Sequence, residues 1–317
     1  MNETVDNTVT DAESDGPVGL TKYDELPDAP PKRRLKLTVV GKVATAIVCF
    51  WILMVAIGPY ISPYHEADII ADDSFTEPGE WCSEWEEDLC GDFLLGTDYL
   101  GRDVFSRIIW GARTTIGVAF LSTVLAYLLG VTLGIAAAVG GAKLDMSLSR
   151  VNDAFISIPH IMMGLVIIAA VGSSIPILIG ASGFIYMTVV FRISRALALD
   201  VMVSDFVEAA RARGEGLFWI IRKEILPNIA MPMATDFGLR LVFIILFISS
   251  LSFLGLGVQP PHSDWGSMVR ENLQGLVYGS WAPIAPALAI ATLTISINLI
   301  VDDVSAHAGG KLAKRMI

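Results

Sequence analysis

Charged residues are scarce in this chain: they make up 17% of its 317 residues, whereas 53% are hydrophobic. An average soluble domain is about one quarter charged, so this composition argues against a water-soluble enzyme. Glycine (28 residues) and proline (15 residues) are ordinary in number and follow no period, which excludes a collagen-like or low-complexity chain. The mean hydropathy of +0.59 instead indicates a membrane protein.

Positive charge is also in short supply, because 33 acidic residues outnumber 22 basic ones and leave a net charge of −11. Without a basic surplus to neutralise phosphates, nucleic acid is excluded as a partner. The acid is concentrated in residues 1–28 and 66–103, which hold 8 and 13 Asp and Glu. Solvent-facing acidity of this kind is typical of proteins that stay soluble at very high salt, so we expect a halophilic source.

The chain has no phosphate-binding loop. Gly41-Lys42 and Gly310-Lys311 are each followed by an aliphatic residue, and neither has a glycine five positions earlier. The four histidines lack the spacing of metal ligands, so we expect neither a metal nor another cofactor. We therefore expect no ATP binding and no catalytic residue in this chain.

Long apolar runs suffice for six membrane-spanning helices and predict an all-α membrane protein. Each run corresponds to roughly 25–39 Å of helix, against a hydrocarbon core of about 30 Å. The predicted spans are 39–61, 115–140, 153–171, 175–191, 233–257 and 282–301. In chain order we expect a disordered polar tail at 1–36, a first helix at 37–61, an external acidic loop at 62–113, a transmembrane core at 114–303 with a cytoplasmic loop at 192–232, and a tail at 304–317.

Basic residues decide the orientation, because loops on the cytoplasmic side of a membrane carry an excess of Lys and Arg. With a cytoplasmic N-terminus, seventeen of the 22 bases fall in inner segments and four in outer ones, while Arg240 lies near the inner end of the fifth span. We therefore expect a multi-pass protein of the cell membrane with both termini in the cytoplasm. No signal peptide is expected, since some 36 polar residues precede the first span.

Two of the three cysteines, Cys82 and Cys90, flank an acidic stretch of the external loop, whereas Cys49 lies in an apolar run. Because the outside is oxidising and the loop between them is short, we predict a Cys82–Cys90 disulfide worth about 2.5 kcal/mol. Two free thiols are the alternative. Further along, Thr97 or Asp98 is expected to cap an interfacial helix that leads into the second span.

The cytoplasmic loop contains a polar segment, residues 205–227, that is too long for a simple turn. Asp205 followed by Glu208 fits a capping box, and Gly214 or Gly216 fits the end of a short helix. This pattern predicts a first short helix that begins near residue 205.

A second short helix is expected to begin near Leu217 and to stop before Pro227, which cannot continue the hydrogen-bond ladder. The two helices are either a plain connector or a docking surface. In the second interpretation, the small side chains of Ala209, Ala210 and Gly214 let a partner approach the backbone closely.

The chain contains three ordered segments that together resemble a known family, namely LGTDYLGRDVFSRIIWGAR (95–113), EAARARGEGLFWIIRKEILPN (208–228) and LSFLGLGVQPPHSDWGSMV (251–269). They resemble inner-membrane permeases of binding-protein-dependent ABC importers, in particular the C-type permease of the oligopeptide, dipeptide and nickel group. The resemblance covers about residues 37–303. It implies that ATPase coupling belongs to Glu208, Ala209, Ala210, Gly214, Leu226 and Pro227.

The resemblance also implies the function and the partners. The chain would form half of a translocation pathway for peptides or a similar small solute and would work by alternating access. The implied partners are a second homologous permease, two ATP-binding subunits that hydrolyse ATP, an external solute-binding protein, and membrane lipid.

Two other functions compete with this interpretation. An intramembrane serine protease would use Ser182, which lies in a Gly-x-Ser-Gly sequence, but the later histidines His262 and His307 fall outside the spans. An ATP-independent transporter or channel would need ionisable groups deep in the membrane. We assign the candidates to cytoplasmic helix ends, where snorkelling or capping explains them: Asp153, Asp236, Arg240, Asp302 and Asp303.

Overall fold

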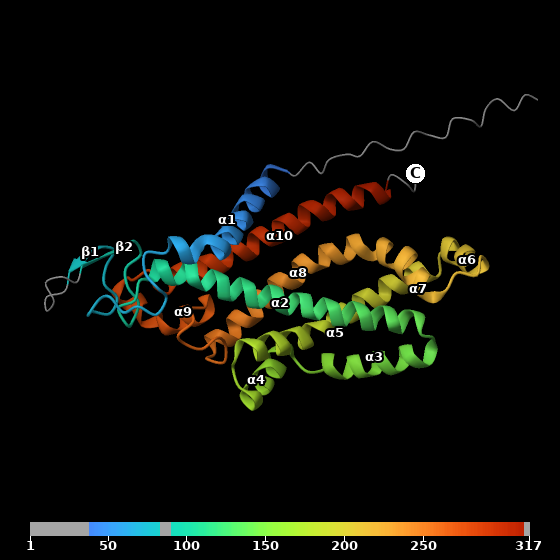
Figure 1. Cartoon of the computed structure of the whole chain (residues 1–317), viewed down its shortest axis with the longest axis horizontal. Helices are drawn as coiled ribbons and strands as arrows, with labels where there is room; N and C mark the ends of the chain where they lie inside the picture. The colour runs from blue at the N-terminus through green and yellow to red at the C-terminus, as the bar shows by residue number, and fades with distance from the viewer. Residues whose placement is uncertain (1–37, 83–89, 314–317) are drawn as a thin grey trace, which may run out of the picture. The chain divides into compact units, whose positions relative to one another are not determined.

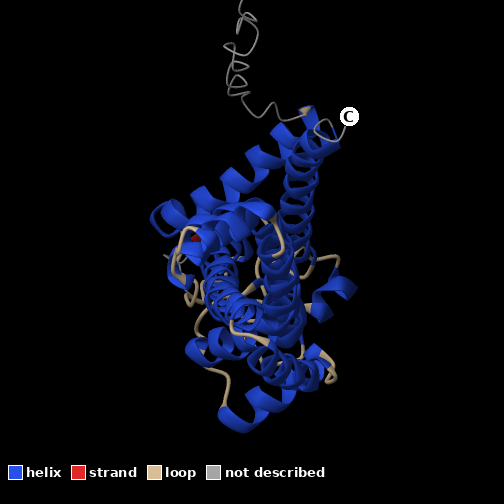
Figure 2. Ribbon diagram, turned by 90° about the vertical axis from the view of Figure 1, so that its right-hand side faces the viewer, coloured by secondary structure: helices blue, strands red, loops and turns tan. Residues whose placement is uncertain are grey.

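The structure, a computed structural model, describes residues 38–82 and 90–313, and Figure 2 shows that this part of the chain is mostly helical. These residues belong to one unit of contacts that covers residues 37–317. The tail predicted at 1–36, the acidic stretch 83–89 and the last residues of the tail predicted at 304–317 lie outside the described residues.

Five helices of the described chain are long and apolar enough to cross a membrane, and a bent pair adds a sixth if it counts as one span. The five are α1 (Val39–Ile61), α2 (Val104–Val139), α5 (Ile175–Met202), the continuous helix Leu217–Phe253 that contains α8 (Leu226–Phe253), and α10 (Ile284–Ala313). The bent pair is α3 (Ala142–Ile156) and α4 (His160–Val171), which meet at 84°. A helical membrane protein is therefore confirmed.

The interfacial helix and the second span predicted from the sequence are one helix. α2 is 36 residues long, and its N-cap is Asp103, whose side chain accepts a hydrogen bond from the backbone N–H of Ser106 at 2.8 Å. The prediction that Thr97 or Asp98 caps this helix is therefore wrong. The two predicted helices merge because no proline separates them.

The third predicted span, 153–171, is broken near its start. Pro159 is the N-cap of α4, with extended ψ of 130°. A proline disfavours the helical conformation of the residue before it, so α3 ends at Ile156 and the chain turns before α4 begins. The fourth and sixth spans instead run beyond their predicted ends, to Met202 and Ala313.

The helices α2 and α5 lie side by side along most of their length (Figure 1). Glycines of α2 allow this approach: a Cβ atom at Gly134 would lie 2.0 Å from the Ser194 hydroxyl oxygen, and one at Gly130 would lie 2.6 Å from Val190 Cβ. Small residues at such a crossing let two membrane helices gain van der Waals contact. This pair has the most extensive contact of any two elements in the described chain.

The beginning of α1 lies beside the late part of α10. The Asp303 carboxylate accepts a hydrogen bond from the backbone N–H of Thr38 at 2.8 Å, so it caps α1 from another helix. Figure 1 shows α1 and α10 running together. The capping interpretation of Asp303 is therefore confirmed.

Short elements lie at the two ends of these helices. At one end are the strands β1 (Gly79–Cys82) and β2 (Cys90–Phe93), α9 (Trp265–Glu271) and the 3₁₀ helix η2 (Leu273–Tyr278); at the other are α6 (Asp205–Ala212), α7 (Leu217–Ile220) and the π-helix η1 (Ile221–Ile225) (Figure 1). β1 and β2 are antiparallel and place Cys82 opposite Cys90. Cys82 is disulfide-bonded, and Cys90 stays its predicted partner; Cys49 is a free, exposed thiol.

Candidate functional site

The segment from the end of α5 to the first residue of α8, residues 203–226, contains most of the residues singled out from the sequence, and we call it the α6–α7 segment. α6 begins at Asp205, and its N-cap Ser204 makes no side-chain capping hydrogen bond. The Ser204 hydroxyl instead donates to the backbone carbonyl of Val201. The predicted capping box of Asp205 and Glu208 is therefore wrong, because the helix begins one residue earlier than a cap at Asp205 requires.

Only one face of α6 is open to a partner. Val207 and Ala210 are completely buried and belong to the hydrophobic core, whereas Glu208 and Ala209 are exposed. The prediction that Ala210 offers its small side chain to a partner is therefore wrong, since its methyl group packs against the rest of the chain. Ala209 and Glu208 remain available for contact.

α6 ends in a Schellman motif at Gly214, whose φ is +84°. The Gly214 N–H donates to the Arg211 carbonyl at 2.9 Å, and the Glu215 N–H donates to the Ala210 carbonyl at 3.2 Å. A Cβ atom at Gly214 would meet nothing within 4 Å, so glycine is needed for its conformation and not for space. Of the two predicted helix ends, the structure selects this one, because Gly216 has an ordinary φ of −74° and precedes α7.

The second helix does not stop before Pro227, contrary to the prediction. α7, η1 and α8 follow one another without a break and form one helix from Leu217 to Phe253. Pro227 lies in the first turn of α8, directly after the π-helical turn. The wider hydrogen-bonding pattern of a π turn accommodates the missing N–H of the proline, so the chain continues as a helix.

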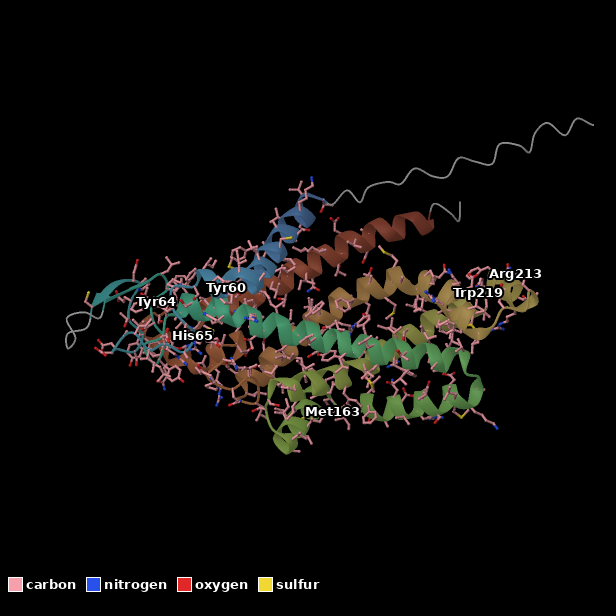
Figure 3. The ribbon with its side chains drawn as sticks, viewed as in Figure 1. Tyr60, Tyr64, His65, Met163, Arg213 and Trp219 are labelled. Atoms are coloured by element: carbon pink, nitrogen blue, oxygen red, sulfur yellow. The ribbon has the colours of Figure 1, made fainter. Side chains whose placement is uncertain are left out.

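The α6–α7 segment exposes several large apolar side chains among charged ones: Val203, Phe206, Leu217, Phe218 and Leu226. The guanidinium of Arg213 lies 5.9 Å from the centre of the Trp219 ring, and Figure 3 shows both residues at this end of the helices. Exposed apolar side chains with a charged rim are typical of a surface that another protein covers.

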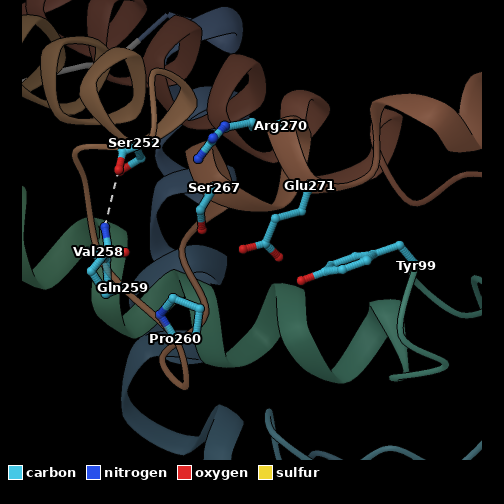
Figure 4. Close-up of a pocket in the computed structure, with 9 residues that line it drawn as sticks. Tyr99, Ser252, Val258, Gln259, Pro260, Ser267, Arg270 and Glu271 are labelled. Carbon is cyan, nitrogen blue, oxygen red and sulfur yellow. Dashed lines mark hydrogen bonds between the residues drawn. The ribbon is translucent and has the colours of Figure 1, made fainter.

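A cleft of about 420 Å³ lies at the opposite end, between α9, the end of α8 and the loop before α2 (Figure 4). Polar groups predominate in its wall: Tyr99, Ser252, Gln259, Ser267, Arg270 and Glu271. The sequence reasoning marked the two motifs that supply these residues but did not predict that they face one another.

Two buried arginines fix one wall of this cleft. Arg102 Nε lies 2.7 Å from a carboxylate oxygen of Asp98, and Arg107 pairs with the same carboxylate. A terminal nitrogen of each arginine also lies 3.4 Å from a carboxylate oxygen of Glu271. The two guanidinium groups of this cluster thus balance its two carboxylates. This cluster connects α9 to the beginning of α2.

Asp264 is a further buried carboxylate in this region. It caps α9 by accepting from the Ser267 N–H at 3.1 Å, and it accepts from the Thr115 hydroxyl at 2.8 Å. Burial raises the pKa of Asp264 above its ordinary value in spite of these hydrogen bonds.

Comparison with known proteins decides the family. Residues 130–308, more than half of the chain, match the family described as the binding-protein-dependent transport system inner membrane component. The chain belongs to this permease family.

Similar proteins bear the same kind of name. A glutathione transport system permease protein of Pectobacterium atrosepticum is 30% identical over 263 residues, which cover 82% of this chain and 84% of the relative. A dipeptide transport system permease protein of Bacillus subtilis is 30% identical over 286 residues, or 89% of this chain and 85% of the relative. A solved chain of the MetNI methionine ABC transporter in an inward-facing conformation is 17% identical, with a TM-score of 0.52 over 63% of this chain and 95% of that one, and shares the fold.

The protein is accordingly a permease subunit of an ABC importer, and ATP hydrolysis resides in separate subunits. Family membership decides against the ATP-independent transporter. Family membership decides equally against the protease alternative. Within those residues, no cluster of three or more His, Cys, Asp or Glu could hold a metal ion.

The permease contains an ion pair within its apolar helices that the sequence interpretation misjudged. Asp236 of α8 accepts a hydrogen bond from the Tyr127 hydroxyl of α2 at 2.5 Å and one from Arg240 Nε at 3.1 Å. The snorkelling explanation is wrong for this pair, because the Asp236 carboxylate is buried and held by a neighbouring span. The sequence could have indicated this pair, because Asp236 and Arg240 are opposite charges one helical turn apart in an apolar run.

Proposed function

We propose that the permease imports peptides across the cell membrane and forms one half of the translocation pathway. The relatives named for dipeptide and glutathione transport support this cargo class. The proposed assembly contains a second homologous permease, two ATP-binding subunits and an external solute-binding protein, all in contact with membrane lipid or with the permease.

In this proposal both termini are cytoplasmic, and the bent pair α3–α4 counts as one of six crossings. Seventeen of the 22 basic residues then fall in inner segments, as the positive-inside rule requires. The contact of Asp303 with Thr38 supports the even number of crossings, because it brings the beginning of the first span beside the end of the last. The α6–α7 segment lies at the end of the helices toward which α10 runs (Figure 1).

The α6–α7 segment is the proposed docking surface for the ATP-binding subunits. One observation carries this proposal: the exposed Leu217 and Phe218 begin the same continuous helix that becomes α8. A partner that moves these side chains would displace a membrane-spanning helix directly, and alternating access needs such a rigid connection. The other proposed contacts are exposed on the same segment or just after it: Glu208, Ala209, Gly214, Leu226 and Pro227.

A matched pair of leucines tests this proposal. Leu217 is 48% exposed in the α6–α7 segment, and Leu276 is 53% exposed in η2 at the opposite end. Burying a leucine against a partner contributes about 2 kcal/mol, so Leu217→Ser should reduce ATPase subunits recovered with the purified permease by at least about tenfold. Leu276→Ser should leave that recovery unchanged.

The readouts are the ATPase-to-permease ratio after affinity purification and ATP-dependent uptake in proteoliposomes. Equal recovery and uptake for Leu217→Ser and the parent would show that the segment is a plain connector. Equal losses in both variants would indicate a general loss of folding and would also contradict the proposal.

A further inference from the structure

The guanidinium of Arg240 uses only part of its hydrogen-bonding capacity. Its Nε atom donates to Asp236, and its plane lies over the Phe243 ring, 5.1 Å from the ring centre. Among the described residues, no hydrogen-bond acceptor contacts its two terminal nitrogens, and the side chain keeps 16% of its surface exposed. The two terminal NH₂ groups are therefore open to a ligand.

This open group lies on the continuous helix Leu217–Phe253, which is long and apolar enough to cross a membrane. About 18 Å of helix separates Tyr127 from the end of α2 at Val139, and about 25 Å separates Asp236 from the end of α8 at Phe253. An arginine at such depth is costly, and in membrane proteins it marks a substrate or ion pathway by default. A lipid-facing position would leave its terminal nitrogens without any acceptor.

Neutralising Asp236 does not explain the arrangement. The two oxygens of that carboxylate are already shared between the Tyr127 hydroxyl and Arg240 Nε. A pair that served stability alone would use the bidentate fork of the guanidinium, or would be replaced by packed apolar residues. Here Tyr127 holds Asp236, and Asp236 binds the arginine through Nε alone, so the two terminal nitrogens of the guanidinium take no part in the pair.

The chemistry of the open group selects the ligand. A guanidinium fork with two free NH₂ groups matches the planar geometry of a carboxylate. Phe243 lies under it and is 49% exposed, so it offers an aromatic surface to an apolar side chain next to that carboxylate. A peptide with a free C-terminus presents both groups together.

We propose that Arg240 and Phe243 form a cargo-contact site inside the translocation pathway, which binds the C-terminal carboxylate and adjoining side chain of a peptide as it crosses. Asp236 and Tyr127 are positioning residues of this site. The inference rests on the proposed function, because it takes the cargo to be a peptide.

Transport per ATP hydrolysed tests the site in the complete importer. The permease, its partner subunits and the solute-binding protein are reconstituted in proteoliposomes and given a tritiated mixture of short peptides. Arg240→Gln should lower peptide uptake by about tenfold, the effect of losing one charged contact of about 1.4 kcal/mol, while ATP hydrolysis stimulated by the loaded solute-binding protein stays near the parental rate. Arg240→Lys should retain part of the uptake, since it keeps the charge and loses the fork.

The double variant Asp236→Asn/Arg240→Gln guards against misfolding, because it leaves no unpaired charge in the membrane. It should show the same loss of uptake per ATP. Unchanged uptake in both variants would overturn the site, as would a parallel fall of uptake and ATP hydrolysis. Loss of the second permease from the purified variant would assign the open fork to that subunit and would also overturn the proposal.

Cross-linking gives a readout that a structural role would not produce. The photoreactive p-benzoylphenylalanine in place of Phe243 should capture tritiated peptide during ATP-driven transport. The same label in place of Phe50, which is 51% exposed on α1, should not. Equal capture at both positions, or none at Phe243, would refute the contact. Absence of uptake by the parental importer would instead refute the peptide cargo of the proposed function, and with it the ligand assigned here.

Discussion

The helix end at Gly214 offers the sharpest test of how the permease couples to its ATPases. Its φ of +84° lies in the left-handed region, where an L-residue costs about 1–2 kcal/mol and a β-branched one more. A Cβ atom at this position would meet nothing within 4 Å, so Gly214→Thr adds conformational strain without a clash at Cβ. If the strain is relieved by unwinding, the Schellman hydrogen bonds are lost instead, at about 1 kcal/mol each.

Either outcome disfavours the docking geometry by about 2 kcal/mol, which corresponds to roughly a 30-fold fall in its population. The membrane spans should be unaffected, because Gly214 is exposed and lies outside the helices that are long enough to cross a membrane. We therefore expect Gly214→Thr permease to insert and fold normally, and to lose most of its ATPase subunits and its uptake.

Gly216→Thr is the matched control. Gly216 also has open space around it, but its φ of −74° and ψ of 159° suit any residue, and threonine caps a helix about as well as glycine. Gly214→Asn should fall between the two variants, since asparagine tolerates the left-handed region better than threonine. Co-purification of the ATPases and uptake in proteoliposomes measure the effect. Equal behaviour of Gly214→Thr and Gly216→Thr would refute the conformational reasoning.

Four further predictions concern other parts of the molecule. A cysteine at Asp73 should react with an impermeant maleimide from outside the cell, and one at Ser147 only after the membrane is opened; the reverse pattern would overturn the orientation. Mass spectrometry of the non-reduced peptide should find Cys82 linked to Cys90, and two free thiols would refute that pairing. Burial raises the pKa of Asp264 above its ordinary value of 3.8, so the contribution of this residue to stability is present below pH 3.8 and is lost as the pH rises through the raised pKa. The melting temperature of Asp264→Asn should therefore rise relative to that of the parent as the pH increases. A difference in melting temperature that does not depend on pH would contradict this. The acidic composition predicts a lower melting temperature in low salt, and equal stability would argue against a halophilic source.

The sequence alone determined the fold class and the family. Apolar runs long enough to cross a hydrocarbon core predict the spans, because the membrane imposes a minimum length that can be counted along the chain. The motifs around residues 95–113, 208–228 and 251–269 identify the family for a similar reason, since they are contiguous in sequence. The sequence also limited the end of the first short helix to Gly214 or Gly216, because a left-handed residue at a helix terminus is a local requirement, and the structure selects Gly214.

Only the tertiary structure decided which side chains face a partner and which face the interior. Ala209 and Ala210 are identical neighbours in sequence, yet one is exposed and the other is buried in the hydrophobic core. Pro227 predicts a helix end, but the π turn before it lets the helix continue into α8. The contact of Tyr127 with Asp236 joins residues 109 positions apart, and it leaves the fork of Arg240 open. Local patterns cannot predict such features, because the rotation of each helix is set by the packing of all its neighbours.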